Sequence, residues 1–276
     1  MMHAQYRALA GSLAFLEDIG EGRPVLCIHT AGQSGVQWRG VGGALARFGR
    51  RVVVPDLPGH GRSEPAPGGP VRDLGSYAAW CEELVEALGL DRPYVVGCSI
   101  GGKIALDLAC RLGEKLSGVV AMAADAGLDP AAGRAMARGL ERELEDSAAP
   151  SRTDRTYYGT LAVVGRAVPA ERRRLIADMH RREDPAVSTS DLIGWASHDV
   201  WSGLPSVRCP VHLVVGGDDL WVDAARVRRT ADLIPGARYT LLDGIGHYPM
   251  EEMDDFASVL DGWLGELGGP PSPASP

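Results

Sequence analysis

The sequence predicts an α/β fold in which one mostly parallel central sheet is flanked by helices and a helical segment is inserted between two of the strands. Short apolar runs alternate along the chain with longer stretches whose apolar residues recur at helical spacing, as in βαβ units. Residues 125–200 interrupt this alternation with helical patterns alone. The chain has 276 residues, 45% of them hydrophobic, which is enough for one large domain with a substantial buried core.

Six short runs rich in valine, isoleucine and leucine predict the strands of the parallel sheet. Their β-branched content and their brevity favour strand over helix. The six runs are residues 25–28, 52–54, 94–96, 119–122, 211–215 and 238–242. A further run, residues 13–19, precedes them and ends at a Gly-Glu-Gly turn, which predicts an antiparallel strand at the edge of the sheet.

Apolar residues at helical spacing predict helices between these strands. One pattern runs from Tyr77 to Leu88 and ends at a glycine, and a second runs from Ile104 to Leu112 and also ends at a glycine. A last helix is expected from about Met250 to Leu267.

The predicted domain organisation is a single core, residues 1–124 and 201–268, with the helical segment 125–200 inserted before the fifth predicted strand. The inserted segment holds arginines and acidic residues in nearly equal number, so its charges are expected on a solvated helical face. Residues 269–276 consist of glycine, proline, serine and alanine, a composition that predicts a disordered tail.

Composition argues against several classes of function. The formal net charge is -8, so the protein as a whole is not attracted to the negative phosphate backbone, and nucleic acid is not expected as a partner. No run approaches the ~20 apolar residues that span a bilayer, and residues 1–10 lack the apolar region of a secretory signal. The five cysteines include no C-x-x-C pair, so no metal site is expected, and their odd number suits a reducing compartment. We therefore expect a cytoplasmic protein.

The strongest chemical signal is Gly97-Cys98-Ser99-Ile100-Gly101, which has the pattern G-x-S-x-G. It directly follows the predicted strand 94–96 and directly precedes the predicted helix 104–112. A serine on such a tight strand-turn-helix connection projects its hydroxyl above the edge of the sheet, and the glycines leave room for the chain to pass. The first N–H groups of the helix favour negative charge at the same place. The pattern therefore predicts a nucleophile at Ser99.

A serine hydroxyl needs a base, and the base needs a carboxylate that orients it. His247 follows the last predicted strand and precedes the final helix, which places it at the carboxyl edge of the sheet, where ligands bind in open α/β folds. Asp218 and Asp219 follow the strand 211–215 at the same edge, and Asp125 follows the strand 119–122. Chemistry alone leaves these three aspartates open as candidates for the acid.

The remaining histidines have less specific surroundings. His180 lies in the inserted helical segment and is expected to face solvent, and His198 at its end is expected on the surface. His212 lies inside a strand and is expected to be a core residue. His60 is expected to be structural.

The order Ser99, Asp219, His247 resembles that of the α/β-hydrolase fold superfamily, in which nucleophile, acid and histidine follow one another in this order. Residues 56–63, Asp-Leu-Pro-Gly-His-Gly-Arg-Ser, and residues 246–252 around the histidine also resemble that superfamily. The similarity extends over about residues 13–267. In the G-x-x-D form of the acid turn the resemblance implies Asp219 as the acid, with Asp125 as the alternative that some members use. It also implies that residues 125–200 are a lid over the pocket.

Relatives of this type place an oxyanion hole after the third strand, in a segment that begins His-Gly. Here the segment is His29-Thr30-Ala31-Gly32-Gln33, with threonine in place of the glycine. The matching backbone N–H groups are those of Ala31 and Ile100. Thr30 and Gln33 are candidates for an additional side-chain donor or for a structural turn, and Trp38 is a candidate for a pocket wall or for the core.

The resemblance implies a serine hydrolase that cleaves a small to medium carboxylic ester, thioester or lactone through an acyl-enzyme, without metal or cofactor. A C–C bond hydrolase of the meta-cleavage-product type is an alternative, since those enzymes share the triad, although Tyr248 stands where many of them have tryptophan. A non-catalytic binding protein and an enzyme that removes acyl chains from a carrier protein are further alternatives. The expected partner is a small acyl substrate, with no nucleic acid and no membrane, and a homodimer is left open.

Overall fold

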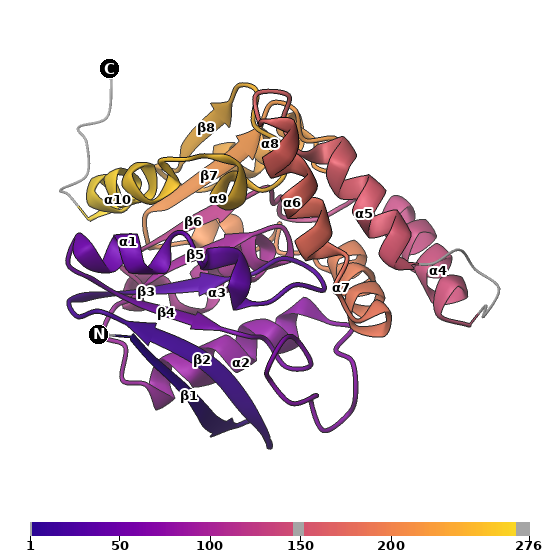
Figure 1. The fold of residues 1–276 in the computed structure, drawn as a ribbon. Coiled ribbons are helices and arrows are strands. Elements are labelled where there is room, and N and C mark those ends of the chain that lie inside the picture. Colours follow the sequence, from indigo (N-terminus) through magenta and orange to yellow (C-terminus); the bar gives the residue numbers. More distant parts are fainter. Residues whose placement is uncertain (1, 146–151, 269–276) are drawn as a thin grey trace.

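The computed structural model describes residues 2–145 and 152–268, which form an α/β structure around one twisted sheet (Figure 1). Within these residues the sheet has eight strands in the order β1-β2-β4-β3-β5-β6-β7-β8. Strand β1 pairs antiparallel with β2 and β2 with β4, while all the other neighbouring strands are parallel. The predicted fold class is confirmed.

The strand bounds extend most of the predicted runs by a residue or two. They are β1 (Met2–Leu9), β2 (Ser12–Ile19), β3 (Arg23–Ile28), β4 (Arg50–Pro55), β5 (Tyr94–Cys98), β6 (Gly118–Met122), β7 (Val211–Gly216) and β8 (Arg238–Leu242). Strand β1 was not predicted. It pairs with β2 along its whole length, yet only Leu9 is buried. Because so little of this strand is buried, its sequence lacks the apolar pattern from which the other strands were predicted.

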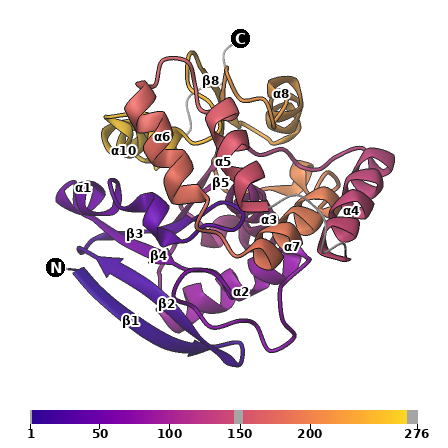
Figure 2. The same ribbon diagram turned by 45° about the vertical axis from the view of Figure 1, so that its right-hand side comes forward.

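Helices cover both faces of the sheet. They are α1 (Gly42–Arg47), α2 (Leu74–Ala87), α3 (Ile100–Leu112), α8 (Ala224–Leu233), α9 (Pro249–Glu252) and α10 (Phe256–Leu267). Helix α1 packs against α10, and α2 packs against α3. Figure 2 shows α1 and α2 on opposite sides of strands β3 and β4. Strands β5 and β6 are buried along their whole length between these layers.

The final helix, expected as one piece from about residue 250 to 267, is divided into α9 and α10. Met253 is extended, with φ -88° and ψ 132°, and ends α9. Asp254 then pairs with Arg172, so the intervening residues turn outward toward α6 (Ala170–His180). The apolar pattern of the two pieces is nearly continuous, which is why the sequence did not reveal the break.

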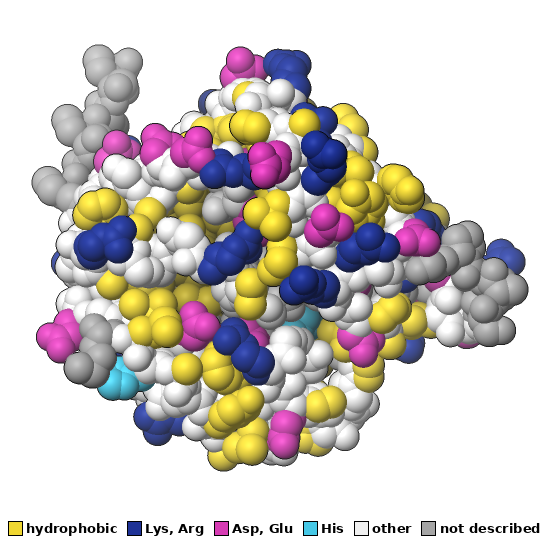
Figure 3. All heavy atoms as spheres, viewed as in Figure 1, with side chains coloured by type: hydrophobic (Ala, Val, Ile, Leu, Met, Phe, Trp, Pro, Cys, Tyr) yellow, Lys and Arg dark blue, Asp and Glu magenta, His cyan; other side chains and the backbone are white. Residues whose placement is uncertain are grey.

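The inserted segment contains α4 (Pro130–Glu145), α5 (Arg152–Val163), α6 and α7 (Pro185–Ser197), between β6 and β7. Helix α4 packs on α7 and α5 on α6, while α7 reaches α2 and α3 in the core. An isolated bridge between Gly127 and Asp199 joins the two ends of the segment. Figure 3 shows positive and negative side chains interspersed over the face that carries α5 and α6.

No helix in residues 2–145 and 152–268 is long and apolar enough to cross a bilayer. The tail predicted to be disordered, residues 269–276, lies outside the described residues.

The connection between β5 and α3 is packed so closely that three positions accept only glycine. A Cβ on Gly97 would lie 2.1 Å from the carbonyl oxygen of Gly101, and a Cβ on Gly101 would lie 2.5 Å from the carbonyl oxygen of Ile28. A Cβ on Gly102 would meet Ala124 and the Met122 carbonyl at 2.6 and 2.7 Å. Most of these contacts are backbone atoms of α3 or of neighbouring strands and cannot move aside. The glycines of the sequence pattern therefore let a helix start directly on the sheet.

Candidate active site

Ser99 occupies the tight turn between β5 and α3. Its φ of 57° and ψ of -118° lie in a region that side chains other than glycine rarely adopt. Such strain, which costs of order 1–3 kcal/mol, persists only where the surrounding structure imposes it. Here the Ser99 N–H donates to the Met122 carbonyl at 2.9 Å, and the Ser99 carbonyl accepts from Lys103 N–H at 3.0 Å. The turn thus holds the hydroxyl at the amino end of α3.

His247 and Asp219 form a close pair beside this turn. The distance from His247 Nδ1 to Asp219 Oδ2 is 2.7 Å, and both side chains are buried. The other oxygen, Oδ1 of Asp219, accepts from the N–H groups of Trp221 at 2.8 Å and Val222 at 3.1 Å. Since the carboxylate has no proton to donate, it fixes the tautomer with hydrogen on Nδ1 and leaves Nε2 as an acceptor.

The histidine loop is held from both sides of His247 by one carboxylate. Glu252 accepts from Gly246 N–H at 2.6 Å and from Tyr248 N–H at 2.9 Å. His247 N–H donates to the Val163 carbonyl at the end of α5, at 3.0 Å. The peptides on either side of the imidazole are therefore fixed, and the inserted segment contributes one of their contacts.

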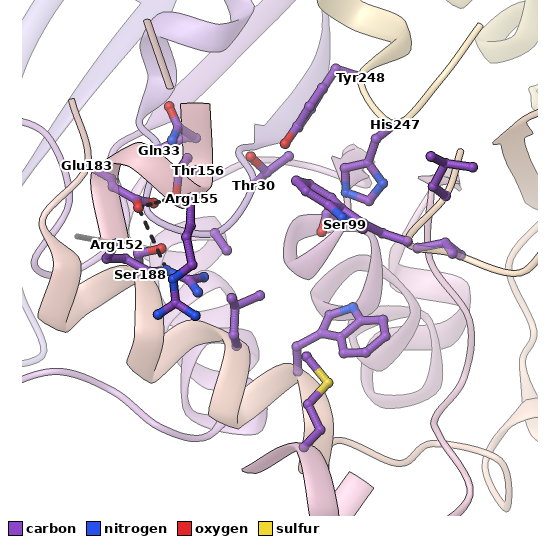
Figure 4. Close-up of a pocket in the computed structure, with 17 residues that line it drawn as sticks. Thr30, Gln33, Ser99, Arg152, Arg155, Thr156, Glu183, Ser188, His247 and Tyr248 are labelled. Atoms are coloured by element: carbon purple, nitrogen blue, oxygen red, sulfur yellow. Dashed lines mark hydrogen bonds and ion pairs between the residues drawn. The ribbon is translucent and has the colours of Figure 1, made fainter. Parts of the chain in front are cut away.

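Ser99 and His247 line the same cavity of about 390 Å³ and lie next to each other in it (Figure 4). Among the described residues, the hydrogen bonds include the contact from Asp219 to His247 but none from the Ser99 hydroxyl. In unliganded enzymes such contacts often tighten only when the substrate binds. The arrangement can pass a proton from the serine to Nε2 once the hydroxyl turns toward the ring.

Asp125, the alternative acid, forms ion pairs with two basic side chains and does not contact His247. Its Oδ1 lies 2.9 Å from Lys103 Nζ and its Oδ2 lies 2.6 Å from Arg226 Nε, with the Asp125 and Lys103 side chains fully buried. Asp218 likewise pairs with Arg166, at 3.3 Å. Of the three aspartates that the sequence left open, only Asp219 contacts His247.

Two backbone N–H groups are candidates for an oxyanion hole, that of Ala31 in the loop after β3 and that of Ile100 at the start of α3. In the described part of the chain, neither Ala31 N–H nor Ile100 N–H donates a hydrogen bond, and Ile100 is the first residue of α3. By contrast, Thr30 N–H donates to Gln37 Oε1 at 2.9 Å and Gly32 N–H donates to Asp191 Oδ2 at 2.8 Å. Both N–H groups that the resemblance implied are thus left without an acceptor in the described residues.

Thr30, Gln33 and Tyr248 line the cavity, as expected for pocket residues. Trp38 does not. It is 2% exposed and packs in the core against Phe256, with ring centroids 6.4 Å apart. The sequence left pocket wall and core open for this residue, and it belongs to the core because the short helix that carries it turns the indole toward α10.

His180 was expected to face solvent, and this is wrong. The ring is buried, and its Nε2 lies 2.6 Å from Glu251 Oε2 and 3.1 Å from Gln37 Nε2. Burial raises the pKa of Glu251, but His180 and Arg39 outweigh it and the net pKa is lowered. His198 is also buried rather than on the surface. Both histidines find partners far away in the chain, which no local pattern encodes.

His212 and His60 are buried, as predicted for core and structural residues. His60 lies 2.8 Å from Asp191 Oδ2, and the carboxylate raises the histidine pKa although burial alone would lower it.

The far side of the cavity from His247 is charged (Figure 4). Arg152 and Arg155 of α5 line it together with Glu183. Glu143 lies 3.6 Å from Arg152 and 2.5 Å from Arg155, and Glu183 lies 3.8 Å from Arg152. Burial raises the pKa of Glu183. These arginines were expected on a solvated face, and their position at the cavity was not predicted.

The profile of the alpha/beta hydrolase fold matches residues 23–142. The chain is also 30% identical over 271 residues to the 2-hydroxymuconate semialdehyde hydrolase of Pseudomonas putida, and the match covers 93% of this chain and 92% of that protein. The chain belongs to the alpha/beta hydrolase family. Two relatives that match this alpha/beta hydrolase over most of its length are hydrolases, and so is this protein.

A second relative of this alpha/beta hydrolase is the pimeloyl-[acyl-carrier protein] methyl ester esterase of Aromatoleum aromaticum. It is 30% identical over 235 residues, 77% of this chain and 86% of that protein. Among solved structures, an esterase from Thermogutta terrifontis superposes with a TM-score of 0.82 at 24% identity, over 97% of this chain and 100% of that one. This last likeness shows the fold.

Two substitutions separate the roles of the aspartates. Asp219→Asn is expected to lower kcat by about 10⁴-fold with little change in stability, because the amide would no longer enforce the imidazole tautomer. Asp125→Asn is expected to cost about 3 kcal/mol of stability, since it leaves the buried Lys103 without its carboxylate. Turnover of a hydrolysable ester and urea unfolding measure the two effects. A folded Asp125→Asn protein with the larger loss of kcat would assign the acid to Asp125.

Proposed function

We propose that this hydrolase cleaves a small to medium carboxylic ester, thioester or lactone through an acyl-enzyme on Ser99. The observation that carries the proposal is the contact of 2.7 Å between Asp219 and His247 beside a serine on a strained turn. The free N–H groups of Ala31 and Ile100 add the donors that such a reaction needs.

In the proposed mechanism, Ser99 Oγ attacks the substrate carbonyl carbon while His247 Nε2 takes the hydroxyl proton. Asp219 holds the ring and balances the charge of the imidazolium. The N–H groups of Ala31 and Ile100 bind the oxyanion, and each such donor is worth ~10²–10³ in rate. The imidazolium returns the proton to the leaving oxygen or sulfur. A water molecule, deprotonated by the same histidine, then releases the acid from the serine.

The size and lining of the cavity support a substrate of modest size. Its volume of about 390 Å³ lies near the lower end for small-molecule sites, which is roughly 300 Å³. Around the serine, apolar side chains predominate and would exclude water from the oxyanion. They are Met136, Leu192, Trp195, Leu220, Trp221 and Val222.

The arginines of α5 favour a second candidate, C–C bond hydrolysis of a meta-cleavage product that carries a carboxylate. At the far end of the cavity, Arg152 Nε has no hydrogen-bond partner in the described residues, and Glu183 lies 3.8 Å from it. A substrate carboxylate there would compete with Glu143 and Glu183 for the arginines. The semialdehyde hydrolase named above is 30% identical to this chain, which agrees with this candidate.

Ser99→Ala is expected to lower kcat by ~10⁶-fold, the scale of other serine hydrolases, because the covalent route is lost. The measurement is turnover of p-nitrophenyl esters of graded chain length. Ser197→Ala is the matched control, since that hydroxyl bonds to the Ile193 carbonyl within α7, away from the cavity lining. Near-wild-type turnover by Ser99→Ala would sink the assignment of the nucleophile.

Arg152→Gln and Arg155→Gln are expected to raise KM about tenfold for a substrate that carries a distal carboxylate, through the loss of a charge-assisted hydrogen bond. The same substrate as its neutral methyl ester is the control and should show little change. Equal effects on the two substrates would argue that the arginines are structural. They would also remove the support for a meta-cleavage product that carries a carboxylate.

A further inference from the structure

Asp191 of α7 is a fully buried carboxylate that joins three segments of the chain. Its Oδ2 accepts from Gly32 N–H and lies 2.8 Å from His60 Nε2, and its Oδ1 accepts from the Tyr77 hydroxyl at 2.9 Å. Gly32 belongs to the loop after β3, and Tyr77 belongs to α2. The mechanism above gives no role to this side chain, although burying a carboxylate is costly.

The proton positions in this cluster follow from elementary chemistry. His60 Nδ1 lies 3.2 Å from the Pro58 carbonyl oxygen and Nε2 faces the Asp191 carboxylate, and both of these groups only accept hydrogen bonds. With Asp191 as the carboxylate, both ring nitrogens carry hydrogen and His60 is a cation, in agreement with the raised pKa of His60. The neighbouring ring of His29 accepts from Leu57 N–H, so it is neutral. Asp191 and His60 thus form a buried ion pair.

Asp191 holds one of the two peptides that flank the Ala31 N–H. The peptide before it, between His29 and Thr30, donates its N–H to Gln37, and the peptide after it, between Ala31 and Gly32, donates to Asp191. Since peptide planes are rigid, fixing both neighbours sets the direction of the N–H between them. Gly32 also lies against the inserted segment, because an added Cβ would be 2.7 Å from Ser188 and Glu183.

We propose that Asp191 is a positioning residue that aims the Ala31 N–H at the oxyanion, so that the inserted segment completes the oxyanion hole. The inference rests on the proposed function, because it takes Ala31 as an oxyanion donor. It adds that α7 sets the rate of the chemical step as well as covering the pocket. Loss of the carboxylate then lowers kcat, with little effect on KM.

The test is steady-state kinetics of Asp191→Ala with a p-nitrophenyl ester. One misdirected oxyanion donor is expected to lower kcat about 10²-fold, with KM within about threefold of wild type. Tyr77→Phe is the matched control. It removes a buried hydrogen bond from the other oxygen of the same carboxylate and leaves the bond to Gly32 in place, so kcat should stay within about threefold of wild type.

The conservative variant supplies a second readout. In Asp191→Asn the amide oxygen can still accept from Gly32 and His60, and the Tyr77 hydroxyl can turn to accept from the amide nitrogen. This variant should therefore recover most of the kcat that Asp191→Ala loses. A purely structural role would leave kcat of the folded Ala variant similar to that of Tyr77→Phe, or would change KM instead, and either result would overturn the proposal.

If Asp191→Ala does not fold, the double variant Asp191→Ala with His60→Ala also removes the cation that would be left unpaired, and the same loss of kcat is expected. Ser99→Ala, measured alongside, keeps the two hypotheses apart. A Ser99→Ala protein that retains turnover contradicts the proposed function itself. An inactive Ser99→Ala with a near-normal Asp191→Ala contradicts only the role of Asp191.

Discussion

The closeness of β5 and α3 at Ser99 is the constraint on which the rest of the site depends. A helix begins directly at the end of a buried strand, and backbone atoms lie where side chains at Gly97 and Gly101 would be. Ser99 is thereby held at a φ of 57° that it would not adopt in an unconstrained peptide. The Ser99 hydroxyl is thereby held at the amino end of α3. The loops that carry His247 and Ala31 complete the site by packing beside this turn.

The loops of His247 and Ala31 are fixed in the same way. In each loop, side-chain acceptors from elsewhere in the chain bind the backbone N–H groups of the neighbouring peptides. Glu252 holds both neighbours of His247. Gln37 and Asp191 hold the neighbours of the Ala31 N–H. Asp191 comes from the inserted segment, and Gln37 contacts His180 of the same segment. Buried acceptors of this kind keep loops in one conformation, as preorganised catalysis requires.

The sequence predicted the sheet, the order of its parallel strands along the chain and several of the residues that line the cavity, among them Ser99 and His247, because each lies in a short pattern with a physical cause. It failed where position depends on distant partners. Strand β1 exists through its pairing with β2 and has only Leu9 buried. His180 is buried because Glu251, 71 residues further on, lies beside it. Asp125 and Asp219 follow strands in equivalent positions, so chemistry alone left both open and only the resemblance implied Asp219. In the structure their partners distinguish them, since Asp219 contacts His247 and Asp125 contacts Lys103 and Arg226. Asp191 carried no signal, since its three partners lie more than 100 residues away in the chain.

The central claim is that Ser99 is a nucleophile activated by its neighbours. The most direct test is to treat the folded wild-type protein with a fluorophosphonate and to identify the labelled peptide by mass spectrometry. One phosphonyl adduct, on Ser99, is expected, and it should form much more slowly in Asp219→Asn. A folded protein that stays unlabelled, or that is labelled on another residue, would contradict the claim.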